Sequence, residues 1–437
     1  MFRSVSGPGP RRTWLVLLLL AAAVPVYGTD WEIEFVDDAI NWIGSDLDIA
    51  VAPDGTPHIA NGTHPSQIIR YAVKQGGVWV IEEVDDYPSG PGARIALDPD
   101  GNAALLYPDW DRLGFARRIG GEWHLETIGR GQGGALCFVG GGVPHVAYAK
   151  RDDPWLLKHA WKPADVWQTE VADPTVASGY ATDIIADAAG GLYVSHWAAP
   201  NYGGGPFQIR YSRWDGSAWQ HEVLDDTVQN CNVSRTGIAL DAAGEPHIAY
   251  ATSHCWGHSA VRYAVRTGGN WQITTIDPAL PSSASVRLIL DRACRPHVVY
   301  GTGYSMVGGS SVLRYAHLDD EGDWVVETID DDGDAGEMNA LAIDAAGYLH
   351  VAYFRGFGPD TQYGEVLYAR STTPVVACAA DVDGDGDTDL ADLAALLAAY
   401  GTSVGEPGYN DSADFDADGD VDLADLAFLL ADYGCGG

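Results

Sequence analysis

The sequence predicts an all-β fold, a seven-bladed β-propeller closed by an N-terminal strand, followed by a small all-α module at the C-terminal end. Three observations predict this organisation: a four-strand unit that recurs along the chain, a last unit that lacks one strand, and two copies of an acidic loop followed by a Leu-rich segment. A chain of 437 residues is long enough for two or three domains.

The recurring unit is recognised by its third strand, which carries Tyr-Ala or a close variant. In a typical unit an apolar strand ends in Asp-x-x-Gly, a Pro-His-Ile-Ala-Tyr strand follows, and Gly-Gly-x-Trp-x-x-Glu completes the unit. For the fifth unit we expect strands A to D at residues 235–241, 247–251, 261–266 and 271–276. Repeats of this size with four strands each are typical of β-propeller blades. The seven elements, 44 to 53 residues apart, begin at Tyr71, Phe115, His159, Tyr211, Tyr263, Tyr315 and Tyr368.

The seventh unit is incomplete, and the start of the chain supplies the part that it lacks. The Trp-x-x-Glu strand occurs in six units, because the seventh unit stops soon after Tyr368. Residues 31–37, Trp-Glu-Ile-Glu-Phe-Val-Asp, have the same pattern. We expect them to pair with residues 365–371, which closes the ring and removes an open sheet edge. The alternative is an open solenoid.

The C-terminal end contains two twelve-residue acidic loops, which begin 33 residues apart at Asp381 and Asp414. Each copy has Asp at loop positions 1, 3, 5, 9 and 12 and Gly at position 6, the pattern of an EF-hand calcium loop. Alternate carboxylates supply the oxygens that a hard cation needs, and the position-7 carbonyls and a water complete the shell. The predicted ligands of two calcium ions are Asp381, Asp383, Asp385, Asp387, Asp389 and Asp392, then Asp414, Asp416, Asp418, Asp420, Asp422 and Asp425.

Two departures from the EF-hand narrow the interpretation of these loops. Position 12 is Asp in place of the usual Glu, and no helix-forming stretch precedes either loop. A duplicated loop and helix of this kind resembles the type I dockerin domain, over residues 379–434. The resemblance implies two calcium ions, docking onto a cohesin-like scaffold protein, and a role in plant-polysaccharide breakdown. Dockerins commonly have small hydroxyl residues at loop positions 10 and 11, whereas both copies here have Leu-Ala, and the module has no basic residue.

Apolar residues at helical spacing follow each acidic loop. We expect these two faces to form the small core between the copies. The residues are Leu393, Leu396, Leu397 and Tyr400 and their counterparts Leu426, Leu429, Leu430 and Tyr433.

Charge and the N-terminal segment bear on location and partners. The net charge is −36, of which the 15 acidic residues after residue 378 supply −15, so nucleic acids and anionic membranes are poor partners. Residues 1–28 have a basic start, an apolar run and then Val26-Tyr27-Gly28, with small residues at the positions that a signal peptidase reads, the pattern of a secretory signal. We expect a monomeric propeller, secreted or attached to the cell surface and outside the membrane after cleavage. The alternative is an uncleaved anchor, although the apolar run is short for a bilayer.

Export would permit disulfides among the six Cys. We expect two bridges, one across the loops of blade 5 and one that clasps the ends of the C-terminal module. The pairs are Cys231 with Cys255, and Cys378 with Cys435. The remaining two, Cys137 and Cys294, fall on different blades and are left unassigned.

The loops on one face of the predicted propeller are the place to expect a ligand. The A–B turns repeat one short sequence, whereas the B–C and D–A loops on the opposite face differ in length and composition, as functional loops do. Asp109, Trp110 and Asp111 combine a stacking surface with carboxylates suited to sugar hydroxyls, and Trp256 lies on another such loop. The alternative is a solvated loop without a ligand.

Charged residues also break the repeat on the innermost strands. Seven residues before the end of each A–B turn the sequence has Asp48, Arg94, Asp183 and Arg287 in four blades and small residues in the other three. One interpretation is that these charges pair with one another, because unpaired charge in a narrow channel is costly. The other is a polar pocket in which the arginines and Arg235 hold a carboxylate or sugar acid, with an Asp as acid or base.

A His recurs on the second strand of five units. Five side chains at one structural position form a ring and cannot converge on one ligand, so we interpret them as groups that secure a turn; a metal or catalytic role is the alternative. The five are His58, His145, His247, His297 and His350.

We divide the chain into a signal peptide (1–28), the propeller (29–370), a linker (371–378) and the dockerin-like module (379–437). Two classes of function fit. In the first, the calcium-loaded module attaches a propeller that binds a glycan or protein; in the second, the propeller is a polysaccharide-degrading hydrolase or lyase. The blades are similar to the short-repeat propellers of sialidase type, but the Ser-x-Asp-x-Gly-x-x-Trp box of that family is absent and the blade count differs. Because no paired acid has a clear partner, the first class is favoured and catalysis is left undecided.

Overall fold

The structure is a computed structural model of the full chain, and it describes most of the residues after 28. The described ranges are 29–40, 47–63, 68–86, 92–109, 111–150, 155–175, 177–200, 207–228, 235–252, 259–280, 285–303, 311–319, 321–356, 363–375, 380–383, 388–416 and 418–435.

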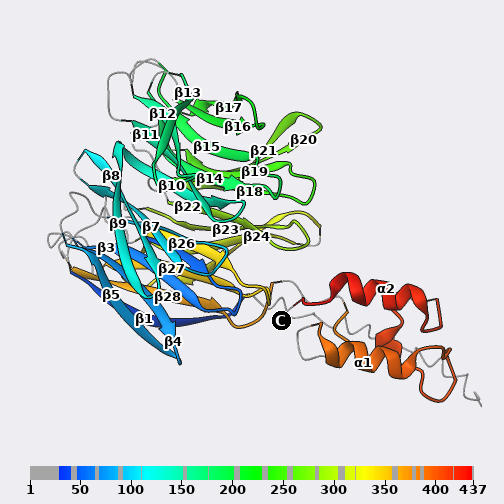
Figure 1. The fold of residues 1–437 in the computed structure, drawn as a ribbon. Coiled ribbons are helices and arrows are strands. Elements are labelled where there is room, and N and C mark those ends of the chain that lie inside the picture. The colour runs from blue at the N-terminus through cyan, green and yellow to red at the C-terminus, as the bar shows by residue number, and fades with distance from the viewer. Residues whose placement is uncertain are drawn as a thin grey trace, which may run out of the picture.

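In these residues the strands form seven four-stranded antiparallel sheets, the blades of a β-propeller (Figure 1). Blade 1 is β2 (Leu47–Val51), β3 (Pro57–Gly62), β4 (Ile69–Gln75) and β5 (Val78–Asp85). Blade 2 is β6 (Arg94–Leu97), β7 (Ala103–Asp109), β8 (Arg112–Ile119) and β9 (Glu122–Arg130). Blade 3 is β10 (Gln132–Val139), β11 (Val143–Lys150), β12 (Leu156–Trp161) and β13 (Gln168–Asp173). Blade 4 is β14 (Ser178–Ala186), β15 (Leu192–Ala198), β16 (Phe207–Trp214) and β17 (Trp219–Val228).

The remaining three blades complete the ring. Blade 5 is β18 (Thr236–Leu240), β19 (Pro246–Thr252), β20 (Ser259–Thr267) and β21 (Asn270–Leu280). Blade 6 is β22 (Val286–Leu290), β23 (Pro296–Gly301), β24 (Leu313–Leu318) and β25 (Trp324–Asp330). Blade 7 is β26 (Asp334–Ile343), β27 (Leu349–Gly356), β28 (Tyr363–Ser371) and β1 (Trp31–Ile40). The seven-bladed prediction is confirmed.

Strand β1 closes the propeller as the incomplete seventh unit predicts. It pairs antiparallel with β28, from Trp31 opposite Ser371 to Asp37 opposite Val366. The first described strand and the last strand of the propeller therefore share one sheet, and blade 7 has no missing edge. The open solenoid is excluded.

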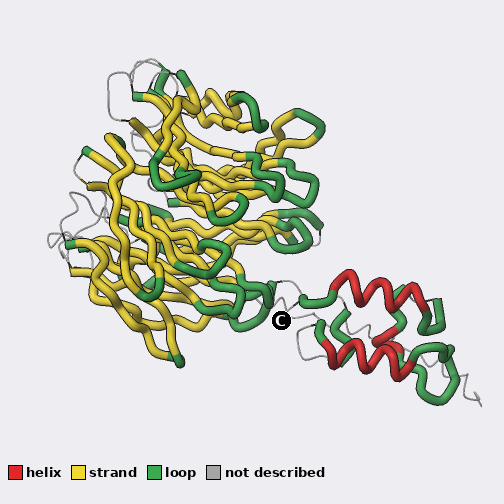
Figure 2. The backbone as a smooth tube through the Cα atoms, viewed as in Figure 1, coloured by secondary structure: helices red, strands yellow, loops and turns green. Residues whose placement is uncertain are grey.

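The core of the propeller lies between the blades. The middle strands β3 and β23 are buried along their whole length, whereas the outer strand β5 is mostly exposed. At the junction of blades 5 and 6, Tyr263 and Val261 pack against Leu288 and Tyr300. Figure 2 shows the strands gathered in the propeller and the helices in the C-terminal module. Because each blade buries one face against the next, the repeated Tyr and Trp are packing residues.

Two repeated hydrogen bonds fix the outer strands and the turns. The indoles of five outer-strand Trp donate to a Glu of the preceding blade at 2.8 to 3.3 Å, in the pairs Trp79–Glu34, Trp123–Glu82, Trp167–Glu126, Trp219–Glu170 and Trp271–Glu222, whereas Trp324 donates to Thr274. Four of the repeated His bond the Tyr hydroxyl of the next strand, in the pairs His58–Tyr71, His247–Tyr263, His297–Tyr315 and His350–Tyr368. Of these, His297 and His350 also reach the Asp of the A–B turn. These contacts give the repeated His a structural role.

The C-terminal module contains helices α1 (Leu390–Ala399) and α2 (Leu423–Asp432) and the short 3₁₀ helix η1 (Asp411–Ala413). Its small core is built around Leu396 and Leu429, which are fully buried. Figure 1 shows the module beside the propeller, where Arg292 of blade 6 donates to the Gly434 carbonyl at 3.0 Å. None of the described helices has the length and hydropathy needed to cross a bilayer.

The predicted core of the module is half wrong. Leu397 and Tyr400 are 52% and 44% exposed, and their counterparts Leu430 and Tyr433 are 56% and 47% exposed. Successive helix residues are rotated by about 100°, so a neighbour of Leu396 points away from the core. The small residues Ala380, Ala399, Ala413 and Val421 take the expected places.

The structure describes one of the four cysteines for which a disulfide is predicted. Cys435 is disulfide-bonded. Its expected partner Cys378 lies outside the described residues, as do Cys231 and Cys255. Cys137 and Cys294 are free thiols.

Candidate functional site

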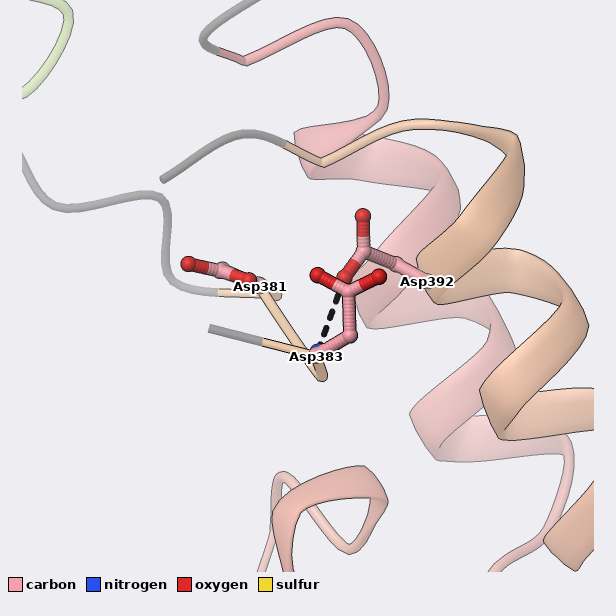
Figure 3. Close-up of side chains that lie close together, drawn as sticks. All are labelled: Asp381, Asp383 and Asp392. Atoms are coloured by element: carbon pink, nitrogen blue, oxygen red, sulfur yellow. Dashed lines mark hydrogen bonds between the residues drawn. The ribbon is translucent and has the colours of Figure 1, made fainter. Parts of the chain in front are cut away.

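Each acidic loop of the C-terminal module gathers three carboxylates. In the first, oxygens of Asp381, Asp383 and Asp392 lie within 4.8 Å of one another (Figure 3). In the second the set is Asp414, Asp416 and Asp418, with the same limit. A site made only of carboxylate oxygens suits a hard cation such as calcium, so the residues fit the predicted ion. Asp385 and Asp387 lie outside the described residues.

The last Asp of each loop ties the loop to the helix that follows. Asp392 is buried and accepts hydrogen bonds from the backbone N–H groups of Val382 and Asp389, both at 2.7 Å. Although burial acts in the opposite direction, these backbone donors lower the pKa of Asp392. Asp425 makes the equivalent bonds in the second loop, to Phe415 at 2.7 Å. The short Asp side chain at position 12 therefore joins the loop to the helix through hydrogen bonds to the loop backbone.

The second loop keeps a carboxylate oxygen without a protein partner. Asp414 accepts from the Tyr409 hydroxyl at 2.7 Å through Oδ2, while its buried Oδ1 has no hydrogen-bond partner in the described protein. The pKa of Asp420 is raised, chiefly by the charge of Asp418. A cation among these groups would relieve the repulsion. The position-9 residues Asp389 and Asp422 cap the helices, each accepting an N–H at 2.6 Å.

Three of the four predicted channel charges meet at the centre of the propeller. Asp48 lies between two guanidinium groups: its Oδ2 is 3.7 Å from Nη1 of Arg94, and its Oδ1 is 3.9 Å from Nη2 of Arg287. Both distances are too long for hydrogen bonds. Asp183 accepts instead from the backbone N–H of Ile238, at 3.1 Å. The pairing that would satisfy all four charges is therefore only loosely made.

The two arginines are buried without a full set of acceptors. Arg94 and Arg287 are 7% and 6% exposed, and Nε of Arg94 and both Nε and Nη2 of Arg287 have no hydrogen-bond partner in the described protein. Burial and the charge of Arg94 lower the pKa of Arg287 to about 10, and the two Asp offset this only in part. Burial also raises the pKa of Asp183, although both arginines act against it. Burial of these charges without a full set of hydrogen bonds costs free energy.

The loop residues proposed for sugar binding are only partly described. Trp110 and Trp256 lie outside the described residues. Asp109 ends β7, and Asp111 forms an ion pair with Arg130 at 2.6 Å. The Arg130 hydrogen bond lowers the pKa of Asp111, so this carboxylate is committed to its neighbour and unsuited to act as an acid.

A cavity of about 430 Å³ lies on the opposite face, at the junction of blades 7 and 1. Its polar lining is already engaged: Lys74 pairs with Glu34 at 2.7 Å, and His350 bonds Asp344 at 3.0 Å. Arg370 stacks on Tyr348. These contacts repeat those of other junctions, so the cavity is a product of blade packing.

Sequence reasoning missed an inter-blade contact near the loop face. The Asp at the end of an outer strand accepts from an Arg or Tyr of the next blade, as Asp225 does from Tyr250 and Arg262, both at 2.8 Å. The signal was present in the sequence, because this Asp stands six residues after the outer-strand Trp in six blades, at Asp37, Asp85, Asp173, Asp225, Asp277 and Asp330.

Comparison with known proteins supports the fold. No protein-family model and no curated protein matches the sequence. An ulvan lyase of polysaccharide lyase family PL25 is 14% identical with a TM-score of 0.54, covering 77% of this chain and 95% of that one. The polysaccharide lyase Uly1 is 11% identical with a TM-score of 0.51, covering 80% and 94%. The SapL1 lectin, solved with α-methyl fucoside, is 15% identical with a TM-score of 0.47, covering 66% and 97%. At these identities the two lyases share the propeller fold, and nothing more follows from the likeness.

Proposed function

We propose that this chain is a secreted modular protein in which a calcium-loaded, dockerin-like module attaches a propeller that binds a glycan. The observation that carries the proposal is the pair of carboxylate triads, one in each acidic loop. The carboxylates of each loop repel one another, and the module has no basic residue that could neutralise them. A bound cation would supply the missing positive charge and order the loops. The signal peptide at 1–28, the boundaries near residues 370 and 379, and the extracellular location belong to the same proposal.

Calcium would be held by this chain's own carboxylates. Asp381, Asp383 and Asp392 would hold one ion, and Asp414, Asp416 and Asp418 the other. The bound ions would neutralise the loops and fix the start of each helix, where Asp389 and Asp422 already cap the first turn.

The exposed face of the module supports an attachment role. Three apolar residues are exposed by between 44% and 67% at the same positions of both copies: Leu390, Leu397 and Tyr400, and Leu423, Leu430 and Tyr433. Apolar residues on a small acidic module that leave the core are typical of a contact surface. We propose that a cohesin-like partner binds this face. Because the face is apolar and acidic, the complementary surface of the partner is apolar and basic.

The propeller supports glycan binding as its cargo function. Two solved structures with TM-scores above 0.5 are a PL25 ulvan lyase and the polysaccharide lyase Uly1, and an ulvan lyase of family PL25 has also been solved bound to -[GlcA(1-4)Rha3S]-. Binding is preferred over catalysis because Asp48 is held between two arginines and Asp111 is paired with Arg130. A carboxylate whose pKa is lowered by an arginine partner, as that of Asp111 is, is a poor general acid or base.

The second candidate is a polysaccharide-degrading lyase or hydrolase, and the fold of the two lyases is what supports it. Its test is the release of reducing sugar or unsaturated uronate from a panel of plant and algal polysaccharides. Release that is lost in Asp48→Asn would support the enzyme, whereas silence across the panel together with saturable binding of one of the polysaccharides would support the binding protein.

Removal of calcium tests the proposed function. Calorimetry of the full chain should give a separate unfolding transition for the module in calcium and none after a chelator, since each site at one hundred times its Kd adds about 2.7 kcal/mol. Asp414→Asn should lower the temperature of that transition, and the matched change Asp411→Asn, outside the loops on η1, should leave it in place. A trace that is the same with and without chelator would contradict the proposal.

A further inference from the structure

The central channel holds more positive hydrogen-bonding groups than its own carboxylates satisfy. Arg94 and Arg287 come from blades 2 and 6, and both point at Asp48 of blade 1, at 3.7 and 3.9 Å. Each guanidinium offers five N–H donors, and in this arrangement Asp48 lies beyond hydrogen-bond distance of both.

The two arginines make few other hydrogen bonds within the protein, and those bonds are long. Arg94 donates to the carbonyl of Thr182 at 3.4 Å, and Arg287 donates to the carbonyl of Val286 at 3.5 Å. Three nitrogens of the two side chains have no partner in the described protein. Leaving a charged donor buried and unpaired is costly, so the fold retains a cost that a ligand with acceptor oxygens would remove.

The residues that flank the charged layer of the channel differ on its two sides. Residues two apart on a strand share a face, so Ala50, Ala96 and Ile289 lie one layer nearer the A–B turns than the three charged side chains. On the loop side the equivalent layer includes Ser285 and Arg235, which are polar and buried. A charged group in this layer would therefore have polar neighbours on the loop side and apolar neighbours on the side of the A–B turns.

We propose that Arg94 and Arg287 form a binding site for a carboxylate group that enters the central channel from the loop face. A carboxylate matches the planar fork of each guanidinium and presents four lone pairs to the donors that lack partners. Asp48 holds the two arginines apart, and Asp183 is bound to the backbone of blade 5 and leaves the arginines free to bind. The ligand class is a sugar acid or small organic acid; the sugar-acid part rests on the proposed glycan-binding function.

Titration calorimetry of the full chain tests the site. With ionic strength held by sodium chloride, sodium glucuronate should bind saturably, acetate should compete with it, and glucose should do neither. Arg287→Gln and Arg94→Gln should each weaken glucuronate binding by about tenfold to one hundredfold, the range for charge-assisted hydrogen bonds. The control Arg292→Gln, an exposed arginine on the opposite face, should leave the affinity unchanged.

A variant that binds more tightly separates an effect on the site from a loss of the fold, because a misfolded protein would not gain affinity. Asp48→Asn removes the carboxylate that competes for both arginines, so glucuronate should bind more tightly than to the natural chain. No saturable binding, equal binding to Arg287→Gln, or complete displacement by an equal concentration of chloride would each overturn the proposal. If neutral glycans bind while glucuronate does not, the proposal of a channel site is wrong and the glycan-binding function stands. If glucuronate binds while no glycan does, the channel site stands and the glycan-binding function is wrong.

Discussion

Aspartate and arginine meet in two regions of this propeller with different results. Between blades, Arg210 reaches Asp173 at 2.7 Å and Arg314 reaches Asp277 at 2.6 Å. In the channel the corresponding distances from Asp48 are 3.7 and 3.9 Å. The inter-blade pairs recur because six of the seven outer strands carry the same Asp, whereas the channel charges break the repeat and have no repeated partner. Aspartate and arginine thus stabilise the fold between the blades, whereas in the channel the arginines keep donors that a ligand can use.

Removal of an inter-blade carboxylate should have the largest effect on stability. Asp225→Ala leaves the fully buried Tyr250 hydroxyl and Arg262 without their shared acceptor. Loss of one partner of a buried pair costs about 3 to 5 kcal/mol, and because Arg262 is partly exposed we expect the lower end, about 3 kcal/mol. Urea denaturation measures the free energy of unfolding. A loss below about 1 kcal/mol would place these contacts among ordinary surface pairs.

The pH dependence of stability should have opposite signs in the two regions. The pKa of Asp225 is lowered, with its hydrogen bonds to Thr227 and Tyr250 and the charge of Arg262 outweighing burial, so it contributes stability above about pH 4 that is lost as the pH falls. Burial raises the pKa of Asp183 despite Arg94 and Arg287, and the charge of Asp48 adds to the rise. Its effect is therefore a loss of stability as the pH rises above about 4.

Denaturation of two amide variants from about pH 2 to about pH 7 checks these signs, because the effect of Asp225 changes below about pH 4 and that of Asp183 above it. Relative to the natural chain, Asp183→Asn should become more stable as the pH rises, and Asp225→Asn should become less stable. The Asn of the first variant can still accept from Ile238, so the difference reports the charge. Parallel curves for the two variants would erase the distinction between the regions.

The smallest effect is expected when a channel arginine is replaced by an apolar residue of similar length. Arg287→Met loses no hydrogen bond shorter than 3.5 Å and leaves Asp48 with Arg94. Removal of a buried guanidinium that lacks acceptors relieves its desolvation cost, which offsets the lost attraction to Asp48 at 3.9 Å. We expect a change in the free energy of unfolding within about 1 kcal/mol. A loss as large as that of Asp225→Ala would make the channel arginine a structural residue.

Periodicity explains how much of the fold the sequence predicts. The seven Tyr-Ala elements and the missing Trp-x-x-Glu strand lead to the ring and to the pairing of β1 with β28, because a repeat constrains every blade at once. The channel positions follow from counting along the repeat. The distances between Asp48 and its arginines do not, since they depend on how strands of three different blades face one another across the channel.

Other features were out of reach or were overlooked. The exposure of Leu397 and Tyr400 depends on which helix face meets the partner copy, and the apolar spacing of ten-residue helices fits more than one face. The Asp six residues after the outer-strand Trp was visible in the sequence but has no recognisable role until neighbouring blades are placed together.

The most direct measurement is a crystal structure of the full chain grown with calcium and glucuronate. The account predicts a carboxylate in the central channel with oxygens about 2.7 to 2.9 Å from guanidinium nitrogens of Arg94 and Arg287. A channel that holds water alone, with both arginines bonded directly to Asp48, would contradict it.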